Sequence, residues 1–209
     1  MDVTIIGTGN MAGGIGKMLV AGGHQVTVLG KETDAAEAVV RDLGADGSAK
    51  AGRFGDEIAD DVVVLAVYYP DAKAAVERYS DALSDRVVVD ITNPVNETLD
   101  GFVTPPDSSA SQELASSAPG ARVVKAFNTT FARTLGEGEV SGQQLDVFIA
   151  GDDDDAKGSV AQLVEDGGLR PVDVGPLKRA RELEAMGLVH MGVQQRLGTG
   201  FGSALKIVS

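Results

Sequence analysis

The sequence predicts an α/β protein with a doubly wound, mainly parallel sheet and a short C-terminal helical segment. Two observations carry this prediction. Short apolar stretches that suit buried strands alternate with helix-like stretches along most of the 209 residues. The first thirty residues also read as strand, glycine turn, helix and strand. The sequence has no internal repeat and no linker, so we expect one domain over 1–176, with 177–209 as a helical segment packed on it.

The expected elements of the first half follow in order. A strand over 2–6 leads through a glycine turn into a helix over 13–21, and a second strand covers 26–29. A helix capped by Thr33 or Asp34 ends near Leu43, and only a short strand fits within 47–56. The continuous apolar run 61–67 is typical of a central parallel strand covered on both faces. Pro70 opens a helix that reaches about 83, and another buried strand runs over 86–91.

The second half of the chain is predicted to contain longer loops. Residues 96–111 are turn-rich, and long ordered loops of this kind are often functional. A helix over 111–117 and a strand over 121–126 follow. A strand over 147–150, a helix to Glu165 that starts at the acidic run Asp152–Asp155, and a strand over 170–174 complete the alternation. The remaining stretch, 177–197, reads as one long helix interrupted by glycine.

Composition and charge exclude several classes of function. The chain has 31 acidic and 18 basic residues and a net charge of −13, which argues against binding to nucleic acid or to an anionic membrane. Without cysteine, it has no disulfide, thiolate metal site or catalytic thiol. No metal site is expected, because the acidic run lacks the alternating spacing of a calcium loop. No run is long enough to span a membrane and no signal peptide is visible, so we expect a cytoplasmic protein.

The glycine turn, Gly7-Thr8-Gly9-Asn10-Met11-Ala12, is expected to bind the pyrophosphate of a dinucleotide. Gly7 permits the tight turn, Gly9 lets the backbone approach the phosphates, and Ala12 takes the small third position beside the sheet. The N–H groups at the N-terminus of the next helix would hold the anion. The alternative is a glycine-rich turn without a ligand. The complete strand–turn–helix–strand unit around the turn favours the dinucleotide.

The residues after the second strand indicate which dinucleotide binds. NAD-binding proteins usually carry Asp or Glu there, which accepts hydrogen bonds from the ribose 2′-hydroxyl. This sequence has Gly30 followed by Lys31, and a lysine beside a small residue suits a 2′-phosphate, to which Thr8 could add a hydroxyl. NADP(H) is therefore favoured over NAD. Glu32 could turn inward and complicate this assignment, and Lys31 could be an ordinary surface lysine.

Six segments recur in the same order in one known family. They are Gly7–Met11, Val89–Pro94, Val124–Thr129, Ala150–Asp152, Pro171–Gly175 and Glu182–Met186. On these motifs, which span nearly the whole chain, the sequence resembles the NADPH-dependent deazaflavin-coenzyme reductases and the related cytosolic domain of the six-transmembrane metalloreductases. The resemblance implies a Rossmann-type fold in which 1–176 binds NADP(H). It also implies a small-molecule co-substrate, 8-hydroxy-5-deazaflavin or FMN/FAD, stacked on the nicotinamide.

The turn and the resemblance together imply a set of site residues. The cofactor-binding set is Gly7, Thr8, Gly9, Asn10, Met11, Ala12, Gly30, Lys31, Val67, Tyr68, Tyr69, Asn93, Pro94, Ala126, Phe127 and Asn128. The second-substrate pocket would be formed by Asn128, Thr129, Thr130 and Met186. The sequence departs from the family at Asn128 and Thr130, where His and an aliphatic residue are usual. It also has Gly30-Lys31 where the family has a Ser-Arg pair.

No residue is assigned as a catalytic acid. His24 lies in a turn remote from the strand ends, so we expect it to be structural. His190 is either a group that reaches the cleft or a partly buried residue of the last helix. Lys125 either assists at the site or pairs with a carboxylate. Tyr69 and Lys73 match the Tyr-x-x-x-Lys spacing of short-chain dehydrogenases, but they straddle a proline, so a role for the tyrosine in the cofactor wall is preferred.

These observations favour an oxidoreductase that moves hydride between NADPH and a deazaflavin or flavin coenzyme. Hydride exchange between two stacked rings needs distance and orientation more than an acid–base pair. One alternative is an imine or carbonyl reductase, which would need a larger helical domain unless a dimer shared its C-terminal residues. Another is a non-catalytic NADP-sensing module. The glycine-marked stretch 186–192 could pack against its own copy, so a homodimer is expected.

Overall fold

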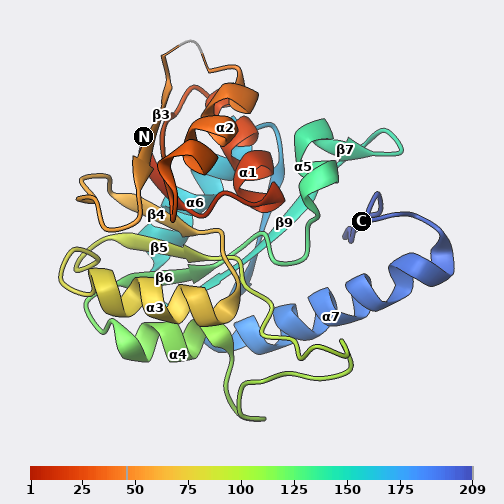
Figure 1. The fold of residues 1–209 in the computed structure, drawn as a ribbon. Helices are drawn as coiled ribbons and strands as arrows, with labels where there is room; N and C mark the ends of the chain where they lie inside the picture. Colours follow the sequence, from red (N-terminus) through yellow and green to blue (C-terminus); the bar gives the residue numbers. More distant parts are fainter. Residues whose placement is uncertain (46, 209) are drawn as a thin grey trace.

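The computed structural model describes residues 1–45 and 47–208. Its centre is an eight-stranded sheet in the order β10-β9-β6-β5-β4-β1-β2-β3 (Figure 1). The elements of the first half are β1 (Asp2–Ile6), α1 (Asn10–Ala21), β2 (Gln25–Gly30), α2 (Thr33–Leu43), β3 (Ala49–Arg53), β4 (Val62–Leu65), α3 (Tyr69–Tyr79) and β5 (Val87–Asp90). The second half contributes α4 (Ala110–Ser117), β6 (Arg122–Lys125), α5 (Ala132–Glu137), β7 (Glu139–Val140), β8 (Gln143–Gln144), β9 (Asp146–Gly151), α6 (Asp154–Asp166), β10 (Arg170–Gly175), the 3₁₀ turn η1 (Leu177–Arg179) and α7 (Ala180–Leu197).

Helices cover both faces of the sheet because alternate strand residues point to opposite sides. On one face Val3, Ile5, Val62 and Val64 pack in a cluster with residues of α1, α2 and α6. On the other face Ile6, Val63 and Leu65 pack with residues of α3 and α4. All four residues of β4 are buried, as expected for a central parallel strand. The predicted doubly wound α/β class is confirmed.

The sheet changes its winding direction at β1. This strand pairs in parallel with β2 on one side and with β4 on the other, so successive connections leave in opposite directions. In open parallel sheets, ligands bind in the crevice outside the carboxyl ends of the strands at such a switch point. The glycine turn after β1 lies at this place.

The sheet departs from parallel order once. Strand β9 runs antiparallel to β6, and β10 is again parallel to β9. The sequence did not reveal this reversal, nor the short helix α5 and the β7–β8 hairpin that precede β9. These elements are only six and two residues long, so their residues carry little periodicity. Helix α5 packs against α1, and its contact explains why Gly14 of α1 is close to the Ala132 carbonyl oxygen.

Several predicted boundaries are corrected. Helix α1 begins at Asn10, three residues earlier than expected, because Gly9 already has the extended conformation of a helix-capping residue. The C-terminal stretch is one turn of 3₁₀ helix followed by α7, and neither Gly187 nor Gly192 interrupts α7. The irregular loop before α4 is confirmed, with one isolated bridge between Val95 and Phe102.

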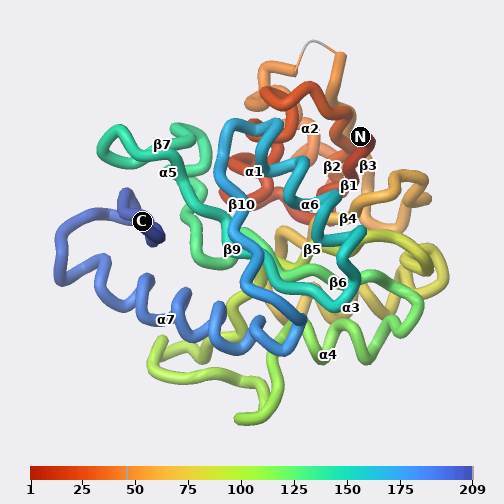
Figure 2. Tube along the Cα trace, turned by 180° about the vertical axis from the view of Figure 1, so that it is seen from behind, coloured from red at the N-terminus to blue at the C-terminus, as the bar shows by residue number. Residues whose placement is uncertain are grey.

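The C-terminal tail turns back after α7 toward α5 (Figure 2). The side chain of Phe201 in the tail contacts Phe131 edge-to-face at 5.0 Å between ring centroids. The buried Asp146 carboxylate accepts hydrogen bonds from Arg170, from Lys206 and from the Ile207 backbone N–H. Within the described residues, no helix combines the length and the apolar character needed to cross a membrane.

Candidate functional site

The glycine turn brings β1, β2 and β4 into close contact. Gly7 has a φ of +128°, and a Cβ at this position would lie 2.2 Å from the Ala66 carbonyl oxygen. The Gly7 N–H donates to the Leu29 carbonyl oxygen at 2.9 Å, and Val67 packs 3.0 Å from where the Cβ would be. Only glycine meets both the backbone angle and the spacing here.

The N-terminus of α1 is open above this turn. Its capping residue, Gly9, has no side chain to bond the first-turn N–H groups, which are the groups that a helix leaves unpaired. A Cβ at Gly9 or Gly13 would meet no atom within 4 Å, so there is room beside the backbone. Ala12 is fully buried against the sheet. This arrangement fits a pyrophosphate held by backbone N–H groups and the helix dipole.

The carboxyl end of β2 carries the residues predicted to select NADP. A Cβ at Gly30 would lie 2.7 Å from the Glu32 carbonyl oxygen and 2.9 Å from Thr8 Cγ2, so glycine is required for Thr8 to approach this strand. The Lys31 ammonium lies 2.8 Å from a carboxylate oxygen of Asp71, at the start of α3. Glu32 is exposed and precedes the first residue of α2. The amine of Lys31 is therefore directed toward the first turn of α3, and the lysine side chain remains exposed.

Tyr68 and Tyr69 have different environments. The side chain of Tyr68 is 84% exposed and is open to a ligand. Tyr69 is buried, and its hydroxyl donates to a carboxylate oxygen of Glu113 on α4. Burial, together with the hydrogen bond to Glu113, raises the pKa of Tyr69. Lys73 lies 3.9 Å from the same carboxylate, so the Tyr-x-x-x-Lys pair is engaged between α3 and α4 and does not present a free proton donor.

Asn93 and Asn128 form a reciprocal amide pair beyond β5 and β6. Asn128 Nδ2 donates to Asn93 Oδ1 at 2.9 Å and to the Leu183 carbonyl oxygen at 2.8 Å. Asn93 Nδ2 donates to the Asn128 carbonyl oxygen at 2.8 Å. The two backbone acceptors fix the orientation of both amides. Asn128 Oδ1 is buried and has no hydrogen-bond partner among the described residues.

The neighbouring predicted residues form a tight, buried turn. Phe127 has a φ of +60°, which is uncommon for a residue with a bulky side chain, and it packs in the core together with Ala126. The Thr130 hydroxyl donates to the Phe127 carbonyl oxygen at 2.7 Å. Thr129 is also buried, whereas Met186 on α7 is only half-buried. The Thr130 side chain thus stabilises the turn, and Met186 is the more accessible member of the predicted second-substrate pocket.

The structure decides the roles of both histidines. His24 accepts a hydrogen bond from the N-terminal ammonium and lies 3.3 Å from Asp166, which confirms its structural role. His190 is buried, with Nδ1 3.1 Å from the Thr129 carbonyl oxygen and Nε2 2.8 Å from Ser203 Oγ. Burial lowers the pKa of His190. Both of its ring nitrogens are engaged, so it connects the tail to the turn at Thr129.

Lys125 belongs to a fully buried charged cluster. Its ammonium lies 2.9 Å from Asp90 Oδ2, 3.1 Å from Glu184 Oε1 and 2.5 Å from the Thr92 carbonyl oxygen. These three contacts use its three donors, which resolves the two alternatives for Lys125 in favour of pairing. Asp90 and Glu184 were not among the site residues predicted from the sequence. The signal was available, because each lies in one of the recurring segments and Asp90 ends an apolar strand.

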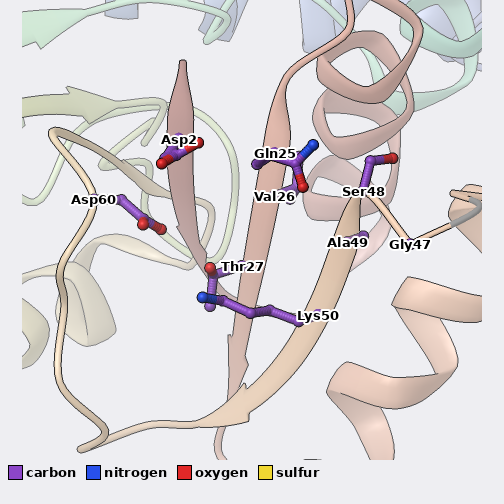
Figure 3. Close-up of a pocket in the computed structure, with 9 residues that line it drawn as sticks. All are labelled: Asp2, Gln25, Val26, Thr27, Gly47, Ser48, Ala49, Lys50 and Asp60. Atoms are coloured by element: carbon purple, nitrogen blue, oxygen red, sulfur yellow. The ribbon is translucent and has the colours of Figure 1, made fainter.

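A separate hollow of about 190 Å³ lies at the other end of the strands, away from the glycine turn. It is lined by Asp2, Gln25, Val26, Thr27, Gly47, Ser48, Ala49, Lys50 and Asp60 (Figure 3). These residues surround the amino ends of β1, β2 and β3, and the Lys50 side chain lies across β2 toward Thr27. Since dinucleotides bind at the carboxyl ends of such strands, this hollow is not the nucleotide site.

Fold and glycine turn together define a dinucleotide-binding α/β protein. Residues 2–94 match the family described as NADP oxidoreductase, coenzyme F420-dependent. This match covers a little under half of the chain. Together with the relatives below, it indicates an NADP-dependent oxidoreductase, and it confirms the resemblance expected from the sequence motifs.

Two relatives with similar sequences support an oxidoreductase assignment. The F420-dependent NADP reductase of Methanothermobacter marburgensis is 27% identical over an alignment 214 positions long, gaps included. The alignment covers 94% of this chain and 95% of that protein. Metalloreductase STEAP3 of Rattus norvegicus is 30% identical over 188 residues, or 89% of this chain. This chain spans only 36% of the length of STEAP3.

Solved structures agree with the fold. A candidate F420-dependent NADP reductase of Arthrobacter sp. FB24 superposes with a TM-score of 0.87 at 26% identity, over 99% of both chains. An imine reductase of Bacillus cereus superposes with a TM-score of 0.67, and this chain covers 63% of it. At 17% identity, the second match shows a shared fold alone.

Proposed function

We propose that the protein transfers hydride between NADPH and a deazaflavin or flavin coenzyme whose ring stacks directly on the nicotinamide. NADPH supplies the hydride, and the acceptor ring takes up that hydride together with one proton. The proposal that NADPH is the cofactor rests on the open N-terminus of α1 above Gly9, beside Gly30 and Lys31. The acceptor half is supported by the reductases of similar length and sequence, whose names include the deazaflavin F420.

In this proposal the residues of the chain bind and orient the cofactor. The first-turn N–H groups of α1 hold the pyrophosphate, and Lys31 exchanges Asp71 for the 2′-phosphate. The Asn93–Asn128 pair lies against the nicotinamide end, and Tyr68 and Met186 are accessible to ring surfaces. Orientation of two rings in contact is the main requirement for such a transfer.

The candidate acid groups support ring-to-ring transfer over carbonyl reduction. Reduction of a carbonyl needs a positioned proton donor. Tyr69, His190 and Lys125 are buried, and each is bonded to protein acceptors. A transfer between two rings does not depend on any of the three.

The test is a steady-state assay in which NADPH oxidation and bleaching of 8-hydroxy-5-deazaflavin are followed together, with FMN and FAD as parallel acceptors. We expect the two absorbance changes to proceed with equal molar amounts for at least one acceptor. Tight NADPH binding in calorimetry without turnover on any ring acceptor would instead identify an NADP-sensing module. Turnover on cyclic imines alone would identify an imine reductase.

We also propose that the protein works in the cytoplasm as a homodimer, and that 177–209 forms one unit with 1–176. Helix α7 contacts α4 and η1 through one side, while Val189 and Leu197 are 67% and 65% exposed. Gly192 is exposed between them and would let a second helix approach closely. Light scattering should give twice the chain mass at micromolar concentration, and a monomer there would contradict the dimer.

A further inference from the structure

Helix α7 rests directly on the Asn93–Asn128 pair. Gly187 is buried, and a Cβ on it would lie 2.7 Å from Asn93 Oδ1 and 3.1 Å from the Asn128 carbonyl oxygen. One turn earlier, the Leu183 carbonyl oxygen accepts a hydrogen bond from Asn128 Nδ2. Residues four apart share one face of a helix, so α7 meets both asparagines along a single stripe. Because Gly187 has no side chain, the backbone of α7 can lie this close to the two asparagines.

A buried charged cluster holds the same helix in place. Glu184 Oε1 accepts from Lys125 Nζ at 3.1 Å and from the Ala110 backbone N–H, at the start of α4, at 2.9 Å. Lys125 also donates to the Thr92 carbonyl oxygen, one residue before Asn93. Since one ammonium joins α7 to the loop that carries Asn93, a shift of the helix must also move the amide pair.

We propose that Gly187 and Glu184 are positioning residues that set the Asn93–Asn128 pair against the nicotinamide end of the cofactor. This inference rests on the proposed function, which places the pair there. The group that awaits a ligand is Asn128 Oδ1, a buried acceptor without a partner among the described residues. Its amide nitrogen is already committed, so its oxygen can accept only from a donor such as the carboxamide N–H of nicotinamide.

The chain offers a matched pair of glycines for the test. Gly187 lies within α7 and Gly158 within α6, so replacing either by alanine raises the helix propensity by the same amount. A Cβ at Gly158 would meet no atom within 4 Å, whereas a Cβ at Gly187 would push against the amide pair. A difference between the two variants therefore reports the contact with the asparagines.

The experiment compares two ligands with the full-length protein by calorimetry. NADPH carries the nicotinamide, and 2′-phospho-ADP-ribose is the same molecule without it. We expect Gly187→Ala to weaken NADPH about tenfold, the equivalent of one lost hydrogen bond, and to change the Kd of the fragment less than about twofold. Gly158→Ala should leave both unchanged. Equal losses for the two ligands, or no loss for either, would overturn the inference.

Substitutions of Glu184 test the second positioning residue. Burial raises the pKa of Glu184. Glutamine has nearly the same shape and keeps the acceptor oxygen that Lys125 and Ala110 use. Glu184→Gln should therefore retain NADPH affinity within about twofold, while Glu184→Leu should lose it about tenfold with the fragment unaffected. If Glu184→Leu does not fold, as judged by circular dichroism, the Glu184→Gln and Gly187→Ala variants still test the positioning role.

The wild-type protein separates this inference from the proposed function. Wild-type protein that binds neither NADPH nor 2′-phospho-ADP-ribose would refute the proposed function. Wild-type protein that binds the fragment as tightly as NADPH would show that the nicotinamide end contributes nothing, which refutes only the role of the amide pair.

Discussion

The Lys31 ammonium lies 2.8 Å from a carboxylate oxygen of Asp71, and the two residues come from opposite sides of the crevice at the β1–β4 switch point. Lys31 follows β2, and Asp71 lies in the first turn of α3, forty residues later. The lysine thus has a counter-ion that a 2′-phosphate would have to replace. Two predictions depend on this pair.

Lys31→Glu should weaken NADPH binding about tenfold to a hundredfold and change NADH binding much less. The reason is that a carboxylate would repel the 2′-phosphate and has nothing to repel in NADH. Calorimetric Kd values for the two nucleotides provide the measurement. Lys50→Glu, the same charge change at the other end of the strands, is the control, and equal losses of NADPH and NADH affinity would contradict the assignment of Lys31.

Asp71→Asn should strengthen NADPH binding several-fold at low salt, because Lys31 loses its competing counter-ion. Both side chains are partly exposed, so the gain should shrink as added salt screens the charges. Titrations of NADPH at two ionic strengths measure this. Weaker NADPH binding in the variant would mean that Asp71 orients Lys31 and does not compete with the phosphate.

Gly7→Ala and Gly9→Ala should fail in different ways. A methyl at Gly7 meets the Ala66 carbonyl oxygen, and the φ of +128° is unfavourable for alanine, so we expect a loss of unfolding free energy of about 3 kcal/mol. A methyl at Gly9 meets no atom within 4 Å. It should lower the unfolding free energy much less than Gly7→Ala, through the loss of a favoured capping residue alone. It should also reduce NADPH affinity, because it occupies the space that the pyrophosphate needs. Urea unfolding and calorimetry on each variant separate the two effects.

Asp146→Asn should destabilise the protein near neutral pH but not in strong acid. Burial alone would raise the pKa of Asp146, but hydrogen bonds from Arg170, Ile207 and Lys206 outweigh it and lower the pKa from 3.8 to about 2. The carboxylate therefore contributes about 2 kcal/mol above pH 4, and this contribution is lost as the pH falls toward 2. Urea unfolding of both proteins at several pH values should show the difference in unfolding free energy between wild type and Asp146→Asn shrink as the pH falls.

The exposed Asp155 supplies the control for this comparison. Asp155→Asn makes the same chemical change in the first turn of α6, away from the tail, and should cost no more than about 0.5 kcal/mol from the lost helix-dipole interaction. A gap between wild type and Asp146→Asn that stays constant down to pH 2 would contradict the account of the buried carboxylate.

The sequence by itself determined the class of the fold, and it predicted the nucleotide end of the site. Both depend on local patterns: the apolar run of β4, the glycines at 7 and 9, and the residues that directly follow β2. Such patterns persist because a strand, a turn or a helix start is decided by neighbours along the chain. The reversal at β9 lay beyond this reach, because strand direction depends on pairing between distant segments.

Only the tertiary structure decided the contacts around the Asn93–Asn128 pair, the proposed nicotinamide end. Three contacts join segments that are at least 35 residues apart in the sequence. They are the pairing of Asn93 with Asn128, the packing of Gly187 against that pair, and the burial of Lys125 with Asp90 and Glu184. A lysine or a glycine in a helix looks the same in the sequence whether it faces water or another backbone. Its partners are known only once the sheet is assembled, because burial sets both the cost of a charge and the room for a side chain.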